Sequence, residues 1–150
     1  MIPTITGTPD TEARYRAGLI STMTAFAPTL FVTFVFNRAI TISKAEAELT
    51  KFRRWVYRSA TGKRRGPGGE MPYMAAVEHE GTNLHIHALF NVSSDLIPRF
   101  EEHAPRLWHK IMKSGNLDIQ VVSDASGVAH YITKELTTGT SHQLLISPTS

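Results

Sequence analysis

Residues 73–90 constrain the fold most, because they have the pattern of two short strands joined by a tight turn. Apolar residues alternate with His85 and His87 through the second half of this segment, at Leu84, Ile86, Ala88 and Phe90. A period of two is typical of a β-strand with one buried face. Residues 80–83 read as the turn. The sequence therefore predicts a hairpin that carries two histidines on one face.

The register of this hairpin decides which carboxylate lies beside the histidines. A two-residue or a four-residue loop pairs position 78 with position 85, which places Glu78 across from His85 on the same face. Glu80 shares that face nearer the turn and is the alternative ligand, whereas a three-residue loop would put His79 opposite His85. Two imidazoles and a carboxylate leave coordination positions open. We therefore interpret Glu78, His85 and His87 as a candidate metal site for Mn²⁺ or Mg²⁺; the alternative is a polar strand face without a ligand.

Composition limits the classes of protein that the chain can belong to. Its 150 residues are the size of one domain, with an expected core over about 28–137, a flexible arm over 1–9 and a tail over 138–150. Without cysteine there is no thiolate metal site, so imidazole and carboxylate must supply the ligands. The first residues lack the features of a signal peptide, and no apolar run is long enough for a membrane span. We expect an intracellular protein with no membrane partner.

Hydrophobic periodicity predicts the other elements, which are strands over 30–36 and 117–122 and helices over 10–23, 43–59, 95–113 and 127–136. Ser43 begins a capping-box pattern at the start of the second helix. Pro105 is expected to break the third helix into two pieces. The order β-α-β-β-α-β with a closing helix predicts an α+β, ferredoxin-like (split βαβ) antiparallel sheet. Helices are expected on one face of this sheet, which leaves the histidine face partly open.

Basic residues are concentrated in the middle of the chain. Between positions 51 and 65 there is no acidic residue, and there are seven basic ones: Lys51, Arg53, Arg54, Arg58, Lys63, Arg64 and Arg65. Such a cluster favours a polyanion such as DNA as the partner. The alternative is a solubilising helix face and loop, although ordinary surfaces mix charges of both signs.

The closing helix carries a second candidate group. Tyr131 and Lys134 are three residues apart and therefore lie on one helix face. Taken alone, this pair has an ordinary interpretation, in which the tyrosine packs against the core and the lysine is solvated.

Together these segments resemble the HUH endonucleases. Residues 30–36 look like the apolar first motif of that family, His85-Ile86-His87 is similar to its His-hydrophobe-His motif, and Tyr131-Ile132-Thr133-Lys134 resembles the Tyr-x-x-Lys motif of rolling-circle replication initiators. The three occur in the family's order over about residues 30–136. The single tyrosine resembles the single-tyrosine group.

The resemblance implies a metal-dependent, sequence-specific endonuclease and strand transferase for single-stranded DNA. Tyr131 would be the nucleophile that forms a 5′-phosphotyrosine, Lys134 would stabilise charge, and Thr33 and Asn37 of the first motif would contact DNA. The substrate would be an origin stem-loop, and because no phosphate-binding loop is present, a helicase would be a separate partner or missing. A transposase or mobilisation relaxase of the same superfamily is one alternative. A non-catalytic ferredoxin-like nucleic-acid-binding module is the other.

Overall fold

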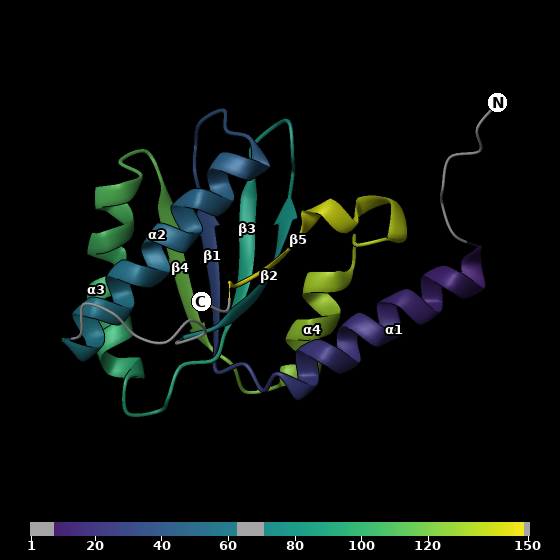
Figure 1. Cartoon of the computed structure of the whole chain (residues 1–150), viewed down its shortest axis with the longest axis horizontal. Coiled ribbons are helices and arrows are strands. Elements are labelled where there is room, and N and C mark those ends of the chain that lie inside the picture. Colours follow the sequence, from purple (N-terminus) through teal and green to yellow (C-terminus); the bar gives the residue numbers. More distant parts are fainter. Residues whose placement is uncertain (1–7, 63–70, 149–150) are drawn as a thin grey trace.

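An antiparallel β-sheet forms the centre of the protein in the computed structural model, which describes residues 8–62 and 71–148 (Figure 1). Its strands are β1 (Leu30–Val35), β2 (Tyr73–Glu78), β3 (His85–Phe90), β4 (Asn116–Val121) and β5 (Leu144–Ile146). They lie side by side in the order β4-β1-β3-β2-β5, and every neighbouring pair is antiparallel. The predicted hairpin is confirmed, because β2 and β3 pair with Glu78 directly opposite His85. The register with His79 in that position is wrong.

Helices separate most of the strands along the chain. They are α1 (Pro9–Ala25), α2 (Ile42–Thr61), α3 (Ile97–Ile111) and α4 (Ala125–Thr133), followed by the 3-10 helix η1 (Thr138–Gln143). The protein is therefore α+β, as predicted, and its element order is consistent in general terms with a ferredoxin-like fold. Within the described residues, no helix is long and apolar enough to cross a membrane.

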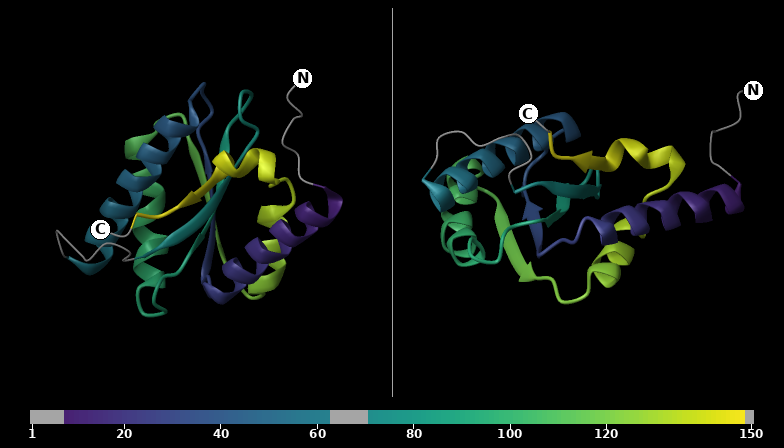
Figure 2. Two further views of the ribbon diagram at one scale, coloured as in Figure 1. Left: turned by 45° about the vertical axis from the view of Figure 1, so that its right-hand side comes forward. Right: turned by 60° about the horizontal axis from the view of Figure 1, so that its bottom comes forward.

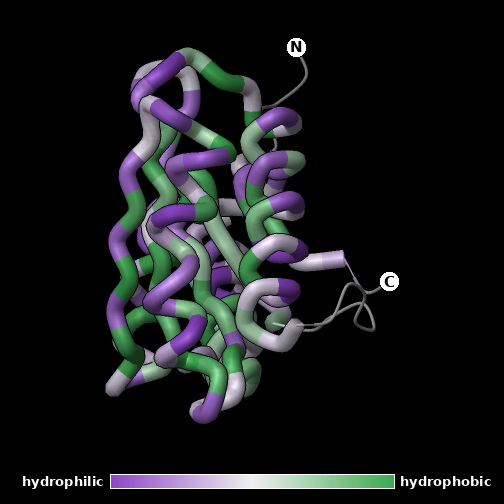
Figure 3. Tube along the Cα trace, turned by 90° about the vertical axis from the view of Figure 1, so that its left-hand side faces the viewer, coloured by the Kyte–Doolittle hydropathy of each residue, from purple (hydrophilic) through white to green (hydrophobic). Residues whose placement is uncertain are grey.

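The larger core lies between the sheet and the pair α2 and α3. Alternate residues of β1 point into it, and Phe34 packs edge-on against Phe52 of α2 and Trp108 of α3 at ring-centroid distances of 5.0 Å each. Apolar residues at helical spacing along α2 are buried, at Ala45, Leu49, Phe52 and Val56. Figure 3 shows the alternation of hydrophobic and hydrophilic residues along the strands. The apolar faces of the helices α2 and α3 and of the sheet therefore pack together in one core layer.

The opposite face of the sheet also carries helices, which corrects the prediction that helices cover one face alone. Met23 of α1 and Ile132 of α4 pack with Met74 and Leu89 of the central hairpin in a second, smaller core. Figure 2 shows α1 and α4 together on this side of the molecule. The cause is local: β2 and β3 are apolar on both faces at this end, so each face needs a cover. Toward β4 the same face stays exposed, at Asn116, Asp118 and Gln120.

Local predictions at helix starts and in the first residues need small corrections. The N-cap of α2 is Thr41, whose hydroxyl accepts from the backbone N–H of Lys44, and not Ser43. Asp124 caps α4, so this helix begins two residues before the predicted start at position 127. Thr8 caps α1, so this helix begins inside the predicted arm. Residues 1–7 lie outside the described part of the chain. Capping groups several residues apart compete, and packing decides which one is used.

Two larger predictions are wrong. The helix α3 runs through Pro105 without a break. A proline removes one backbone donor, but the buried side chains of Leu107 and Trp108 hold the following turn against the core. The predicted tail contains η1 and β5, and β5 pairs with the edge of β2 and buries Leu145. Backbone pairing along a free strand edge orders a segment that is mostly polar in sequence.

Candidate functional site

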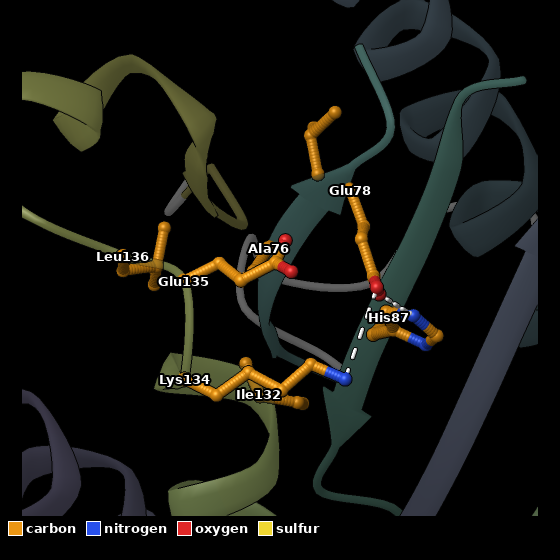
Figure 4. A pocket seen from close by; sticks show the side chains of 8 residues that line it. Ala76, Glu78, His87, Ile132, Lys134, Glu135 and Leu136 are labelled. Carbon is orange, nitrogen blue, oxygen red and sulfur yellow. Dashed lines mark hydrogen bonds and ion pairs between the residues drawn. The ribbon is translucent and has the colours of Figure 1, made fainter. Parts of the chain in front are cut away.

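Three neighbouring strands place the side chains around His87. The pairing of β1 with β3 sets Thr33 beside His87, and the pairing of β2 with β3 sets Glu78 beside His85. The Nε2 atom of His87 lies 2.5 Å from Oε2 of Glu78, and its Nδ1 atom lies 3.1 Å from Oγ1 of Thr33. Both ring nitrogens of His87 therefore have partners (Figure 4 shows the Glu78 contact). Thr33 positions this imidazole, and its contact with DNA stays a prediction.

The electrostatics of this pair favour a carboxylate beside a neutral imidazole. Burial lowers the pKa of His87, and the opposing attraction of Glu78 does not restore it to the ordinary 6.5. Burial raises the pKa of Glu78, but attraction to His87 and to Lys134 outweighs burial, so the net pKa lies below 4.5. At neutral pH, Nε2–H of His87 therefore donates to Glu78, and the Thr33 hydroxyl donates to Nδ1.

His85 lies next to this pair, and its ring is 6.4 Å from that of His87 between centroids. Its Nε2 atom is buried and has no hydrogen-bond partner among the described residues. A buried polar atom without a hydrogen-bond partner lowers stability, and a bound ligand that contacts this nitrogen would account for it.

His79 belongs to the same group of side chains, although strand alternation alone would point it to the other face. The residue has a φ of 59°, a left-handed conformation that turns the chain at the end of β2. Its ring consequently lies 5.5 Å from that of His85, and its Nε2 atom is 3.3 Å from Oε1 of Glu78. The sequence placed His79 beside His85 only if the loop had three residues, whereas the turn geometry brings the two rings together while Glu78 pairs with His85.

Glu80, the alternative carboxylate, points away from the histidines. Its Oε1 atom lies 3.2 Å from Nε2 of His142 and accepts from the side chain of Gln143 at 3.4 Å, both in η1. Of the two carboxylates considered from the sequence, the structure brings only Glu78 into hydrogen-bonding contact with His87.

The closing helix α4 brings Tyr131 and Lys134 to the same place. The ring of Tyr131 lies 5.8 Å from the ring of His87 and 5.8 Å from that of Phe31. Its side chain is 46% exposed. Lys134, the C-cap residue, places its Nζ atom 4.0 Å from the centre of the Tyr131 ring and 3.8 Å from Oε1 of Glu78. The two segments singled out in the sequence thus meet at one point on the surface (Figure 4).

The helix α1 holds the segment that carries Lys134. Arg16 donates to the backbone carbonyls of Lys134 and Leu136 at 3.1 and 3.3 Å. Glu12 accepts from the backbone N–H of Thr138 at 3.2 Å and from its hydroxyl. No motif in the sequence indicated these contacts, since they join residues more than a hundred positions apart.

The predicted DNA-binding stretch is not next to these residues. The helix α2 packs on the other face of the sheet, so Lys51, Arg54 and Arg58 lie away from the histidines. Arg53 is 9% exposed, donates to the carbonyl of Pro148 at 3.2 Å and stacks on Tyr73, which leaves its guanidinium little surface for a DNA contact.

Of the other residues predicted to contact DNA, the structure describes Asn37 but not the basic loop. Asn37 is exposed just beyond β1 and donates to the carbonyl of Ser114 at 2.9 Å. The predictions for Lys63, Arg64 and Arg65 fall outside the described residues.

The fit of a divalent ion can be judged from these side chains. Across residues 8–62 and 71–148, no group of three or more His, Cys, Asp or Glu side chains is arranged ready to hold a metal ion. The donor types nevertheless suit one, and Nε2 of His85 lacks a partner in the described structure. Coordination by Glu78 and His87 would exchange their mutual hydrogen bond for bonds to the ion.

Comparisons with known proteins give no family assignment. No model of a known protein family matches the chain, and neither a curated protein nor a solved structure was found to match it.

Proposed function

We propose that the protein is a metal-dependent endonuclease and strand transferase for single-stranded DNA, built on a ferredoxin-like fold of the HUH type, that initiates rolling-circle replication. The observation that supports this most is the position of Tyr131, exposed on α4 against His87, with the Lys134 ammonium 4.0 Å from its ring centre. A solvent-accessible phenol beside a histidine and carboxylate group is the arrangement that attack on a phosphodiester requires.

Each residue has a role in this reaction. A phenol with an ordinary pKa of about 10 is a poor nucleophile at neutral pH, so a nearby cation is needed to favour its ionised form. Lys134 supplies such a charge beside the ring of Tyr131. The phenol gives up its proton to water, and the Oη atom of Tyr131 bonds to phosphorus as the bond from phosphorus to the 3′ oxygen breaks. That oxygen takes up a proton and leaves as a free 3′ hydroxyl, while the 5′ phosphate stays on the tyrosine.

The metal ion would be held by His85, His87 and Glu78. When bound, a divalent ion polarises the phosphate and neutralises charge that develops on it. Mn²⁺ is the preferred probe, because imidazole ligands favour it over Mg²⁺. The contact of Thr33 with Nδ1 fixes the orientation of the His87 ring, as partners of metal-binding histidines generally do.

The test is formation of a covalent adduct. The wild-type chain is incubated with a mixture of single-stranded origin oligonucleotides and Mn²⁺, and the products are separated on a denaturing gel. We expect an adduct that EDTA prevents and that Tyr131→Phe lacks, although this variant should still bind the strand. The matched control is Tyr15→Phe on α1, which should form the adduct normally. Undiminished cleavage in excess EDTA would exclude the metal site, and a nucleotide mapped by mass spectrometry to another tyrosine would exclude the nucleophile.

A second candidate function is a non-catalytic nucleic-acid-binding module. The direct hydrogen bond between Glu78 and His87 favours it, because a satisfied pair needs no ion. Calorimetric titration with Mn²⁺ separates the two functions. The nuclease requires binding that His85→Ala and Glu78→Ala weaken strongly and Glu80→Ala weakens only slightly. The module requires strand binding that is indifferent to EDTA and to Tyr131→Phe.

A further inference from the structure

A cavity of about 100 Å³ lies at one end of the sheet, outside the group around Tyr131. Its walls are the loop that follows β1 and the connection between β2 and β3, and its lining residues are Arg38, Ala39, Ile40, Gly81, Thr82 and Leu84. Figure 1 shows these two loops at the same end of the sheet. The cavity is therefore formed by segments that are far apart in the sequence.

Arg38 supplies a cation that no acidic residue in the described part of the chain neutralises. Its side chain is exposed, and it makes no hydrogen bond or ion pair with the described residues. Glu80, the residue before Gly81 in the turn, contacts His142 and Gln143 of η1. A guanidinium on the wall of a small cavity, without a carboxylate partner, suits an anion with several oxygens.

The turn of the hairpin adds polar groups to the cavity. The hydroxyl of Thr82 donates to the carbonyl of His79 at 3.1 Å and keeps its own oxygen for a further contact. Within the described structure, the backbone N–H groups of Ala39 and Gly81 donate no hydrogen bond. Free backbone donors next to an arginine are typical of sites that hold phosphate.

The cavity and the candidate metal ligands share one end of the sheet. Val35, the last residue of β1, pairs with His85, and His85 pairs with Glu78. Arg38 follows Val35 by three residues, so its Cα atom lies within about 11 Å of the Cα atom of Val35. The cavity wall at Gly81 and Thr82 is part of the connection between Glu78 and His85. One extended strand of DNA can therefore reach both places.

We propose that this cavity binds a phosphate of the single strand, one that flanks the phosphate attacked by Tyr131. This subsite rests on the proposed function. Its apolar lining residues Ile40 and Leu84 pack with the core under α2, so the subsite lies at the end of the sheet and not on the face that carries the histidines. Arg38 lies outside the run of basic residues, so charge counting along the sequence does not single it out.

The first measurement is affinity for mixed-sequence single-stranded DNA as a function of salt, by fluorescence anisotropy. Arg38→Ala should weaken binding about fivefold and lower the salt slope by about 0.7, the value for one lost phosphate contact on a single strand. Arg38→Lys should retain part of the affinity. The matched control is Arg106→Ala, an exposed arginine of α3, which should change neither quantity. Equal effects of both alanine variants, or none from Arg38→Ala, would overturn the subsite.

The second measurement locates the phosphate. Neutral methylphosphonate linkages are placed one at a time along an oligonucleotide that forms the adduct, and each is tested with wild type and Arg38→Ala. One linkage next to the cleaved one should weaken binding of wild type and leave Arg38→Ala unchanged, the coupling expected of two groups in contact. Equal weakening of both proteins at every linkage would overturn the subsite while the nuclease function stands. If no oligonucleotide forms an adduct, the same scan is read by binding alone, and a coupled linkage then supports a phosphate site in a protein without nuclease activity.

A third measurement separates the strand from a free anion. Titration with inorganic phosphate alone should show weak binding that single-stranded DNA displaces. Tight binding of inorganic phosphate that DNA does not displace would overturn the assignment to the strand.

Discussion

The contact between His87 and Glu78 should make stability depend on pH in a way that identifies the protonation state of the histidine. The side chains of His87 and Glu78 are only 11% and 14% exposed. The pKa of His87 in the folded protein lies below 6.5, mainly through burial. As the pH falls through about 6.5, the unfolded chain therefore binds a proton at this position that the folded chain does not. The free energy of unfolding must fall as the solution is acidified.

The magnitude follows from linkage. One proton contributes at most about 1.36 kcal/mol per pH unit, and between pH 7.5 and 5.5 a histidine that stays neutral when folded loses up to about 1.3 kcal/mol in total. Other histidines titrate in the same range. The quantity to compare is therefore the difference in free energy of unfolding between wild type and His87→Gln, because the contributions of the other histidines cancel in it. An amide at this position cannot take up the proton and can still donate to Glu78.

The assay is denaturant unfolding of both proteins at several pH values from 7.5 to 5.5. The free energy of unfolding of wild type minus that of His87→Gln should fall by up to about 1.3 kcal/mol as the pH is lowered across this range. Glu78, whose pKa lies below 4.5, stays ionised throughout and does not contribute. A difference that grows on acidification would mean a protonated histidine paired with the carboxylate, and it would refute the neutral tautomer assigned here.

Three further predictions concern residues around the site and the core. Tyr131→Ala should lower the free energy of unfolding by up to about 2.5 kcal/mol, because the buried half of this aromatic side chain loses its contacts. Tyr131→Phe should lower it by less than about 0.5 kcal/mol, and denaturant unfolding measures both. Arg53→Ala should destabilise the protein by about 1–3 kcal/mol and leave its affinity for DNA unchanged, whereas the control Arg54→Ala should leave stability unchanged. A weaker affinity of Arg53→Ala for DNA would contradict the buried placement of this residue. Arg16→Ala should cost about 1 kcal/mol and slow adduct formation without changing strand affinity, since it releases the segment that carries Lys134; an unchanged rate would show that α1 does not position that segment.

Local patterns in the sequence were sufficient for β1 to β4, for the positions of most helices and for the hairpin register, but not for η1 and β5 or for the unbroken α3. Alternation over residues 84–90 marks β3, and the four residues of the turn set Glu78 opposite His85, because pairing across a short loop leaves few registers. The choice of Glu78 over Glu80 as the carboxylate in contact with His87 follows from the same arithmetic. Its role as a metal ligand stays a prediction.

Only the tertiary structure decided which faces of the sheet are covered by helices and which charged side chains are exposed to a ligand. The sequence shows Arg53 only as one of seven basic residues, whereas in the folded chain its guanidinium is buried against Tyr73 and the carbonyl of Pro148. His79 enters the site through a left-handed turn, and α1 reaches Lys134 across more than a hundred residues. Periodicity reports on neighbours along the chain, whereas these contacts depend on how separate elements pack, which no local pattern encodes.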